Sequence, residues 1–273
     1  MKPAVFLDRD GTITKGTHLI TSPEELGLEE GAVDGIKLFN TIGLKVIVVT
    51  NQPQIARGMC SEEDVNKINQ KMLQELSNRG AKVDAVYFCP HHPEMHPDVP
   101  EHAKRYRIEC ECRKPNTGML KQAAEKFDLD LSNSFVIGDR TVDVQTGRNA
   151  GCRTILVKTG VAGEDKKYSV VADYEAEDLL QAAKIIKNSP VKAVILAGGR
   201  GERLRPITDS IPKPMIEIGG KPLLQHQIDA LKRSGITDIV ICGSYLVEKI
   251  KNYFGDGSEF GMKIHYPDEP QPL

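Results

Sequence analysis

Short apolar runs alternate with longer amphipathic stretches along most of the chain. The runs have strand length and are almost wholly apolar, which is typical of strands buried on both faces of a parallel sheet. We expect strands over Ala4–Leu7, Lys45–Thr50, Ala85–Cys89, Phe135–Ile137 and Thr154–Val157. Helical spacing predicts helices over Ala32–Thr41, Glu62–Arg79, Gly118–Phe127, Val142–Ala150 and about Ala176–Lys187. The pattern therefore predicts a doubly wound α/β fold, whose ligands gather at the carboxyl ends of the strands.

The segment Asn188-Ser189-Pro190 interrupts this pattern and marks a domain boundary. A chain of 273 residues exceeds the usual size of one domain. We expect a first domain over residues 1–187. A new apolar run begins at Lys192 and opens a second α/β module over residues 191–273, which we expect to be partial because the chain ends soon afterwards.

Charge and cysteine usage exclude several classes of protein. With 36 basic and 38 acidic residues, the net charge of −2 gives no reason to expect a nucleic-acid partner. The apolar runs are too short to span a bilayer, and the N-terminus lacks a signal-peptide pattern, so we expect a cytoplasmic protein with no membrane partner. We also expect a monomer. Six cysteines, three of them clustered, favour metal ligands and reduced thiols over a disulfide framework.

Two carboxylates, Asp8 and Asp10, directly follow the first predicted strand. Residues two apart on an extended chain point the same way, and Gly11 permits a sharp turn, so both carboxylates can face one site. Carboxylates suit Mg²⁺, and in a phosphate ester one can attack phosphorus while the other protonates the leaving oxygen. A simple turn after a strand would explain the same residues, so the interpretation depends on the other strand ends.

Three further segments supply the remaining groups of a phosphoryl-transfer site. They are Thr50-Asn51-Gln52, Arg113-Lys114 and Asp139 with Asp143. Hydroxyl and amide groups can donate hydrogen bonds to phosphate oxygens, the two cations can offset phosphate charge, and Asp139 can complete a Mg²⁺ site with Asp143 as a helper. Each segment alone could be a polar turn, a solvated lysine or a helix cap. Together, in this order, they predict one site.

These segments resemble the four motifs of the haloacid dehalogenase superfamily of phosphatases. The motifs are Asp8-Arg9-Asp10-Gly11-Thr12, Val49-Thr50-Asn51-Gln52, Arg113-Lys114-Pro115 and Gly138-Asp139. The resemblance implies that Asp8 is a nucleophile that forms an aspartyl phosphate, and that Asp10 is general acid and then base. It also implies that Thr50 and Lys114 stabilise the phosphoryl group, and that Asp8, Asp10 and Asp139 hold Mg²⁺. No large cap insertion is evident, so we expect a small substrate.

Four soft ligands lie on two short segments, Cys89-Pro90-His91 and Cys110-Glu111-Cys112. Such a set suits tetrahedral Zn²⁺. Assigning Cys89, His91, Cys110 and Cys112 leaves no coordination position open, which predicts a structural zinc site. His92 as a ligand, or a metal-free cluster of thiols, remain as alternatives. The other cysteines are expected to be ordinary buried thiols: Cys60, Cys152 and Cys242.

This zinc loop, with Arg113-Lys114-Pro115 beside it, resembles the subfamily of D-glycero-D-manno-heptose 1,7-bisphosphate phosphatases and histidinol-phosphate phosphatases over about residues 1–187. The resemblance implies substrate contacts from Arg9, Gly16, Thr17, His18, Leu19, Asn51, Gln52 and Arg113. Zinc at Cys110 and Cys112 would position Arg113 and Lys114. Pro53 and Gly16-Thr17 depart from the usual residues of this subfamily, which leaves the preferred substrate open.

A glycine-rich loop follows the strand that opens the second module. Close backbone approach to phosphates and countercharge for a nucleoside triphosphate are expected from Gly198, Gly199, Gly201, Arg203 and Lys213. Residues 191–273 resemble the N-terminal part of sugar-1-phosphate nucleotidyltransferases. In that family, carboxylates for Mg²⁺ and the sugar pocket come later in the chain, so we expect nucleotide binding at most, without catalysis.

The pairing of the two modules favours a heptose substrate. Removal of the 7-phosphate leaves a sugar 1-phosphate, the substrate class of a nucleotidyltransferase, whereas histidinol phosphate has no such sequel. We therefore expect Mg²⁺-dependent hydrolysis of a small sugar phosphate, with structural Zn²⁺. Two alternatives remain: a histidinol-phosphate phosphatase, and a nucleotide-sugar-binding or sugar-1-phosphate nucleotidyltransferase protein with a silent phosphatase site.

Overall fold

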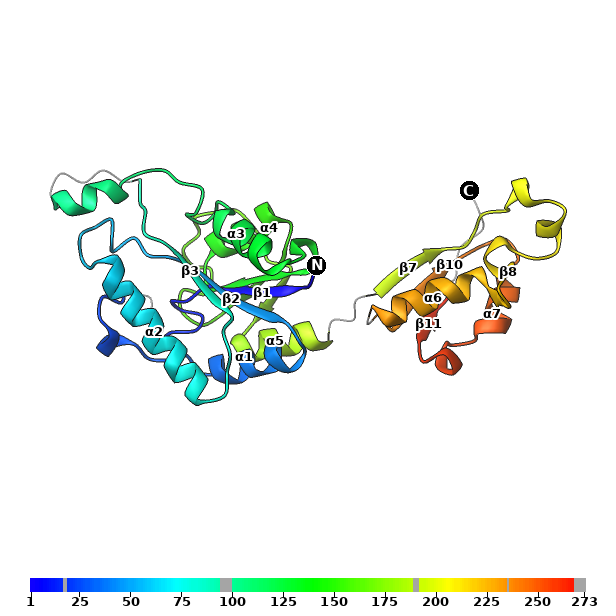
Figure 1. Cartoon of the computed structure of the whole chain (residues 1–273), viewed down its shortest axis with the longest axis horizontal. Coiled ribbons are helices and arrows are strands. Elements are labelled where there is room, and N and C mark those ends of the chain that lie inside the picture. The colour runs from blue at the N-terminus through cyan, green and yellow to red at the C-terminus, as the bar shows by residue number, and fades with distance from the viewer. Residues whose placement is uncertain (17–18, 94–99, 189–191, 235, 268–273) are drawn as a thin grey trace. The chain divides into compact units, whose positions relative to one another are not determined.

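The computed structural model describes residues 1–16, 19–93, 100–188, 192–234 and 236–267. They belong to two compact units, Met1–Asn188 and Ser189–Leu273, each with its own parallel sheet (Figure 1). None of the helices in these ranges is long and apolar enough to cross a bilayer.

The first unit contains a six-stranded sheet in the order β3-β2-β1-β4-β5-β6. Its strands are β1 (Ala4–Leu7), β2 (Lys45–Asn51), β3 (Ala85–Cys89), β4 (Phe135–Gly138), β5 (Arg153–Val157) and β6 (Tyr174–Ala176). Every neighbouring pair is parallel, which confirms the predicted doubly wound fold. The order reverses at β1, which lies between β2 and β4. In such sheets the ligand crevice opens beside the carboxyl end of the strand where the order reverses.

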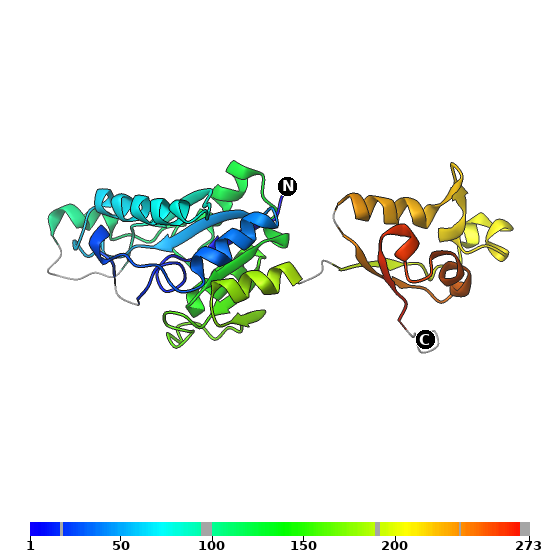
Figure 2. The same cartoon turned by 90° about the horizontal axis from the view of Figure 1, so that it is seen from below.

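Helices cover both faces of this sheet. They are α1 (Ala32–Thr41), α2 (Glu62–Asn78), α3 (Gly118–Phe127), α4 (Thr141–Ala150) and α5 (Leu179–Asn188). Val5 and Leu7 of β1 join the apolar cluster beneath α1, α2 and α5, whereas Ala4 and Phe6 join the cluster beneath α3. Figures 1 and 2 show α1 and α5 on one side of the sheet and α3 and α4 on the other.

A capping box begins α2, since the Ser61 hydroxyl accepts from the Asp64 amide and the Asp64 carboxylate accepts from the Ser61 amide. The prediction of a helix from about Ala176 is wrong at its start. Ala176 ends β6, where it pairs with Val157, and α5 begins at Leu179. The three residues of β6 are too few to show a periodic pattern.

The second unit is built on the parallel sheet β11-β10-β7 and a two-stranded antiparallel pair. Its elements are β7 (Lys192–Leu196), β8 (Glu217–Ile218), β9 (Lys221–Pro222), α6 (Leu223–Arg233), β10 (Asp238–Cys242), α7 (Val247–Phe254) and β11 (Lys263–His265). Its core includes Leu224, Ile228, Ile239 and Phe254. The parallel strands and flanking helices agree with the predicted partial α/β module.

Close packing of α1 against α5 depends on Gly35. A Cβ atom added there would lie 2.6 Å from the backbone oxygen of Leu179. We predict that Gly35→Ala destabilises the unit by about 1–2 kcal/mol, because overpacking costs roughly 1–3 kcal/mol and higher helix propensity offsets up to about 1. Urea titration with pulsed hydrogen exchange of β1 measures this unit separately.

The matched control is Gly27→Ala, whose Cβ would lie 3.8 Å from Lys15 in ordinary van der Waals contact. Its stability should stay within about 0.5 kcal/mol of the parent. Equal effects of the two substitutions would contradict the packing argument.

Candidate active site

A pocket of about 530 Å³ opens at the carboxyl ends of β1, β2 and β4. Its size is that of a small-molecule site. Its lining is Asp8, Asp10, Leu19, Thr50, Asn51, Pro53, Arg57, His92, Arg113, Lys114, Arg140, Val142, Asp165 and Lys167. The four sequence segments predicted to form one site therefore do meet around this pocket, three by lining it and the fourth through Asp139 and Asp143 beneath it.

Lys114 lies at the centre of the site between two carboxylates. Its Nζ atom is 2.9 Å from Asp8 Oδ1 and 2.5 Å from Asp143 Oδ1, and its side chain is only 2 % exposed. Burial alone would lower the pKa of Lys114, but the charges of Asp143 and Asp8 raise it above its ordinary value. The ammonium is therefore a permanent cation beside the predicted nucleophile.

The side chain of Asn51 fixes the position of Lys114 by hydrogen bonds to the Lys114 backbone. Asn51 Nδ2 donates to the Lys114 carbonyl at 3.2 Å, and Asn51 Oδ1 accepts from the Lys114 amide at 3.0 Å. Thr50 lines the pocket, and its hydroxyl oxygen accepts from Gln52 Nε2 at 3.0 Å. The Thr50 hydroxyl hydrogen thus stays available for a ligand oxygen.

Asp139 is fully buried at the end of β4. Its Oδ2 atom accepts from the Val161 amide at 2.7 Å, while Oδ1 has no hydrogen-bond partner among the residues that the structure describes. Burial, reinforced by the charges of Asp8 and Asp143, raises the pKa of Asp139 to about 8. A buried carboxylate oxygen with no partner is costly unless something else occupies it.

Cation ligation would relieve this cost. Ligand atoms of Asp8, Asp139 and Asp143 all lie within 4.8 Å of one another. The three carboxylates face the ammonium of Lys114, with Arg140 Nε 4.0 Å from Asp139 Oδ2, and a hard divalent cation such as Mg²⁺ fits their oxygen donors. Asp10, also predicted to hold Mg²⁺, is not one of these three residues, and its carboxylate accepts hydrogen bonds from Arg9 and Gln52.

The predicted substrate-binding residues separate into three groups. Leu19, Asn51 and Arg113 line the pocket. Arg9 and Gln52 are fully buried and do not line it, and neither does Gly16. Thr17 and His18 lie outside the described residues.

Sequence reasoning missed three cations of the pocket lining: Arg57, Arg140 and Lys167. Arg140 directly follows Asp139, which is the one sequence signal that could have identified it. Arg57 and Lys167 lie on irregular segments after β2 and β5, where no periodic pattern points to a site.

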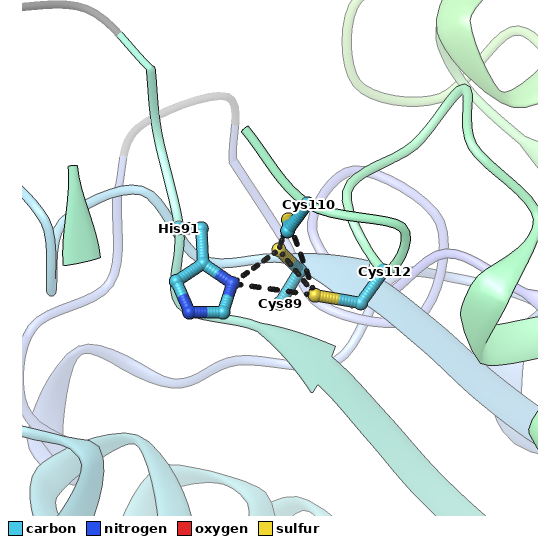
Figure 3. A group of neighbouring side chains, drawn as sticks. All are labelled: Cys89, His91, Cys110 and Cys112. Carbon is cyan, nitrogen blue, oxygen red and sulfur yellow. Dashed lines mark hydrogen bonds between the residues drawn. The ribbon is translucent and has the colours of Figure 1, made fainter. Parts of the chain in front are cut away.

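The four predicted zinc ligands do converge (Figure 3). Cys89 and His91 lie at the end of β3, while Cys110 and Cys112 lie on the segment before α3. The Sγ atoms of Cys89, Cys110 and Cys112 are 3.1–3.5 Å apart, and His91 Nδ1 is 3.4 Å from Cys112 Sγ. Hydrogen bonding between Cys89 and Cys112 lowers the pKa of Cys112 to about 5 and raises that of Cys89, and burial raises the pKa of Cys110. The donor set and spacing fit tetrahedral Zn²⁺.

This cluster adjoins the pocket. Arg113, next to Cys112, donates from Nη1 to the His91 carbonyl at 2.9 Å, so both halves of the cluster fix its position. Of the remaining cysteines, Cys152 is buried as expected, whereas Cys60 and Cys242 are partly exposed.

In the second unit, the glycine-rich loop after β7 packs near the segment of Lys213. Gly201 has a φ of +64°, and a Cβ there would lie 3.3 Å from the Lys213 Cβ. Gly198 and Gly199 precede it, and Arg203 and Lys213 are exposed. The loop and two cations thus occupy one region of this unit.

Two protein-family models match the chain. A model described as nucleotidyl transferase matches residues 192–273, and one described as HAD-hydrolase-like matches residues 111–182. The nucleotidyl transferase match agrees with the resemblance found for the second unit. The HAD-hydrolase-like match agrees with the resemblance found for the first unit.

Relatives and solved structures also match the first unit, over a longer stretch than the HAD-hydrolase-like model does. A D-glycero-beta-D-manno-heptose-1,7-bisphosphate 7-phosphatase of Pasteurella multocida is 35% identical over 190 residues, which cover 68% of this chain and 98% of the relative. A protein of the same name from Rhodopseudomonas palustris is 43% identical over 150 residues, 55% of this chain and 80% of the relative. The structure of D,D-heptose 1.7-bisphosphate phosphatase from B. bronchiseptica, complexed with magnesium and phosphate, is 31% identical with a TM-score of 0.58, covering 68% of this chain and 98% of that one.

The central ion pairs generate a stability prediction. Lys114→Met leaves buried carboxylates without their cation and should destabilise the first unit by about 3–5 kcal/mol. The further change Asp143→Asn should recover part of this loss, because it removes one of the uncompensated charges. Urea titration with pulsed hydrogen exchange of β1 and β4 measures the free energy of unfolding of the first unit in both variants.

Lys45→Met is the matched control, since Lys45 pairs with Asp84 at 2.8 Å but is 37% exposed. It should cost no more than about 1 kcal/mol. A Lys114→Met protein as stable as Lys45→Met would refute the central role of the buried ammonium.

Proposed function

The chain belongs to the family of D-glycero-beta-D-manno-heptose-1,7-bisphosphate 7-phosphatases, and on this basis we propose that it hydrolyses the 7-phosphate of D-glycero-D-manno-heptose 1,7-bisphosphate. The observation that carries the proposal is the meeting of Asp8, Asp10, Thr50 and Lys114 around one pocket. The product would be heptose 1-phosphate and inorganic phosphate.

In the proposed reaction, a carboxylate oxygen of Asp8 attacks phosphorus and the bond from phosphorus to the sugar oxygen breaks. Asp10 gives its proton to that oxygen, and the phosphoryl group remains on Asp8 as an acyl phosphate. Asp10 then takes a proton from water, which attacks phosphorus and releases phosphate. Lys114 offsets the repulsion between the Asp8 carboxylate and the phosphate, and Thr50 donates to a phosphoryl oxygen.

We propose that Asp8 and Asp139, with Asp143 beside them, hold Mg²⁺. Their clustering, the unpartnered Asp139 oxygen and the magnesium in the structure of the B. bronchiseptica relative support this. Bound there, the cation would neutralise charge on the phosphoryl oxygens.

The charge of the pocket supports a bisphosphate over histidinol phosphate. Five cations line the pocket against the three carboxylates of Asp8, Asp10 and Asp165; the cations are Arg57, Arg113, Lys114, Arg140 and Lys167. A second phosphate would find countercharge among these cations, whereas the amine and imidazole of histidinol phosphate would not.

For the second unit we propose nucleotide binding at the loop of Gly198, Gly199 and Gly201, with Arg203 and Lys213 as countercharges. The nucleotidyl transferase match supports this assignment. A sugar 1-phosphate released by the first unit belongs to the substrate class of such enzymes.

For Cys89, His91, Cys110 and Cys112 we propose a structural Zn²⁺ site. The four converging ligand atoms support it. Arg113 bonds to the His91 carbonyl, so zinc would hold one wall of the pocket in place.

Phosphate release tests the main proposal. Parent protein should hydrolyse heptose 1,7-bisphosphate in preference to histidinol phosphate, and Asp8→Asn should lower the rate by about 10³-fold or more because the nucleophile is lost. Asp34→Asn, on the exposed side of α1, is the control and should match the parent. Substantial activity of Asp8→Asn would reject this nucleophile, and a preference for histidinol phosphate would reject the heptose assignment.

Elemental analysis tests the metal cluster. Cys110→Ser should reduce bound zinc from about one equivalent per chain to almost none, since three ligands hold zinc far less tightly than four. Cys152→Ser, which alters a buried thiol outside the cluster, should keep its zinc. Zinc absent from the parent protein, or unchanged in Cys110→Ser, would contradict the assigned ligands.

A further inference from the structure

The carboxylate of Asp10 is held by four hydrogen bonds. Oδ1 accepts from Arg9 Nε at 2.8 Å and from the Thr14 hydroxyl at 3.1 Å. Oδ2 accepts from Arg9 Nη2 at 2.9 Å and from Gln52 Nε2 at 2.8 Å. The two bonds from Arg9 form a bidentate pair, which fixes the plane of the carboxylate as well as its distance.

The guanidinium of Arg9 makes further hydrogen bonds besides those to the Asp10 carboxylate. The side chain of Arg9 is fully buried; Nη1 donates to Asn69 Oδ1 at 3.0 Å, and Nη2 also donates to Gln52 Oε1 at 2.7 Å. Asn69 lies on α2 and is 5% exposed, and Gln52 follows β2. Both acceptors are neutral, so among the described residues Arg9 forms its ion pair with Asp10.

This arrangement has no room for substrate at Arg9. The guanidinium does not line the pocket, and each of its three nitrogens already donates to a protein oxygen. Asp10, by contrast, lines the pocket. The chain of contacts therefore runs from Asn69 through Arg9 to Asp10 and reaches the substrate only at its last member.

We infer that Arg9, Gln52 and Asn69 are positioning residues that orient the Asp10 carboxylate for proton transfer. This inference rests on the proposed phosphatase activity for its chemical role, and it replaces the expectation that Arg9 and Gln52 bind substrate. Buried ion pairs with satisfied hydrogen bonds keep a single geometry. Proton transfer in turn requires the acid to lie within hydrogen-bond reach of the leaving oxygen.

Asn69→Leu tests the inference at the residue farthest from the pocket. It removes the acceptor of Arg9 Nη1, whereas Asn69→Asp keeps an acceptor oxygen there. We measure kcat/KM, which covers the steps up to departure of the leaving group, for heptose 1,7-bisphosphate and for p-nitrophenyl phosphate. The sugar oxygen needs a proton to leave, but p-nitrophenolate does not.

Asn69→Leu should lower kcat/KM for the sugar phosphate roughly 10- to 100-fold and for p-nitrophenyl phosphate less than about 3-fold. Asn69→Asp should recover most of the loss. Gly35→Ala, a destabilising change away from the pocket, and Asn66→Leu, an exposed change on the same helix, should leave the ratio of the two substrates unchanged. Equal losses on both substrates, or no loss, would overturn the inference.

A second measurement needs no turnover and separates this inference from the proposed function. NMR of the Arg9 Nε–H group and the Asp10 carboxyl carbon reports the ion pair directly. Both resonances should shift or broaden in Asn69→Leu and stay near the parent positions in Asn69→Asp. Unchanged resonances in Asn69→Leu would overturn the inference even in an active enzyme, while shifted resonances in a protein that hydrolyses neither ester would uphold the positioning network and reject the proposed function.

Discussion

Charges buried behind the pocket have to be compensated where they lie, and this constraint connects the fold of the first unit to its chemistry. A buried ammonium or guanidinium costs several kcal/mol unless a carboxylate meets it with good geometry. Lys114 meets this requirement with Asp8 from the end of β1 and Asp143 from α4, and Arg9 with Asp10 from the same turn. Three separate segments must therefore be in place before the cations can be buried. The same contacts that stabilise the unit also orient the groups that face the ligand.

Much of this arrangement could be predicted from the sequence, because buried parallel strands are continuous apolar runs and their ends are marked by polar residues. The positions of Asp8, Thr50 and Asp139 at strand ends follow from this. The direction of a side chain beyond a strand end does not, since it depends on what the loop packs against. Arg9 and Gln52 illustrate this, because their sequence positions adjoin the pocket while their side chains are fully buried and do not line it. The edge strand β6 is too short to show a periodic pattern in the sequence. The pocket cations Arg57 and Lys167 lie on irregular segments, where no hydrophobic periodicity marks their positions.

The two units bury their apolar residues separately. Among the described residues, the apolar cluster of the second unit draws on residues from Ala193 onward only, and the clusters of the first unit end at Ile186. The six-stranded sheet, the cluster of Cys89, His91, Cys110 and Cys112, and the described lining of the pocket all lie within Met1–Asn188. A core of this kind can retain its structure independently of what its neighbour does.

The Val161 amide holds one oxygen of the Asp139 carboxylate through a hydrogen bond of 2.7 Å. This donor belongs to the backbone, so it is present whatever side chain stands at position 161, except that of proline. The direction of the Asp139 carboxylate is therefore set by the path of the chain after β5 and is insensitive to most substitutions of Val161 itself.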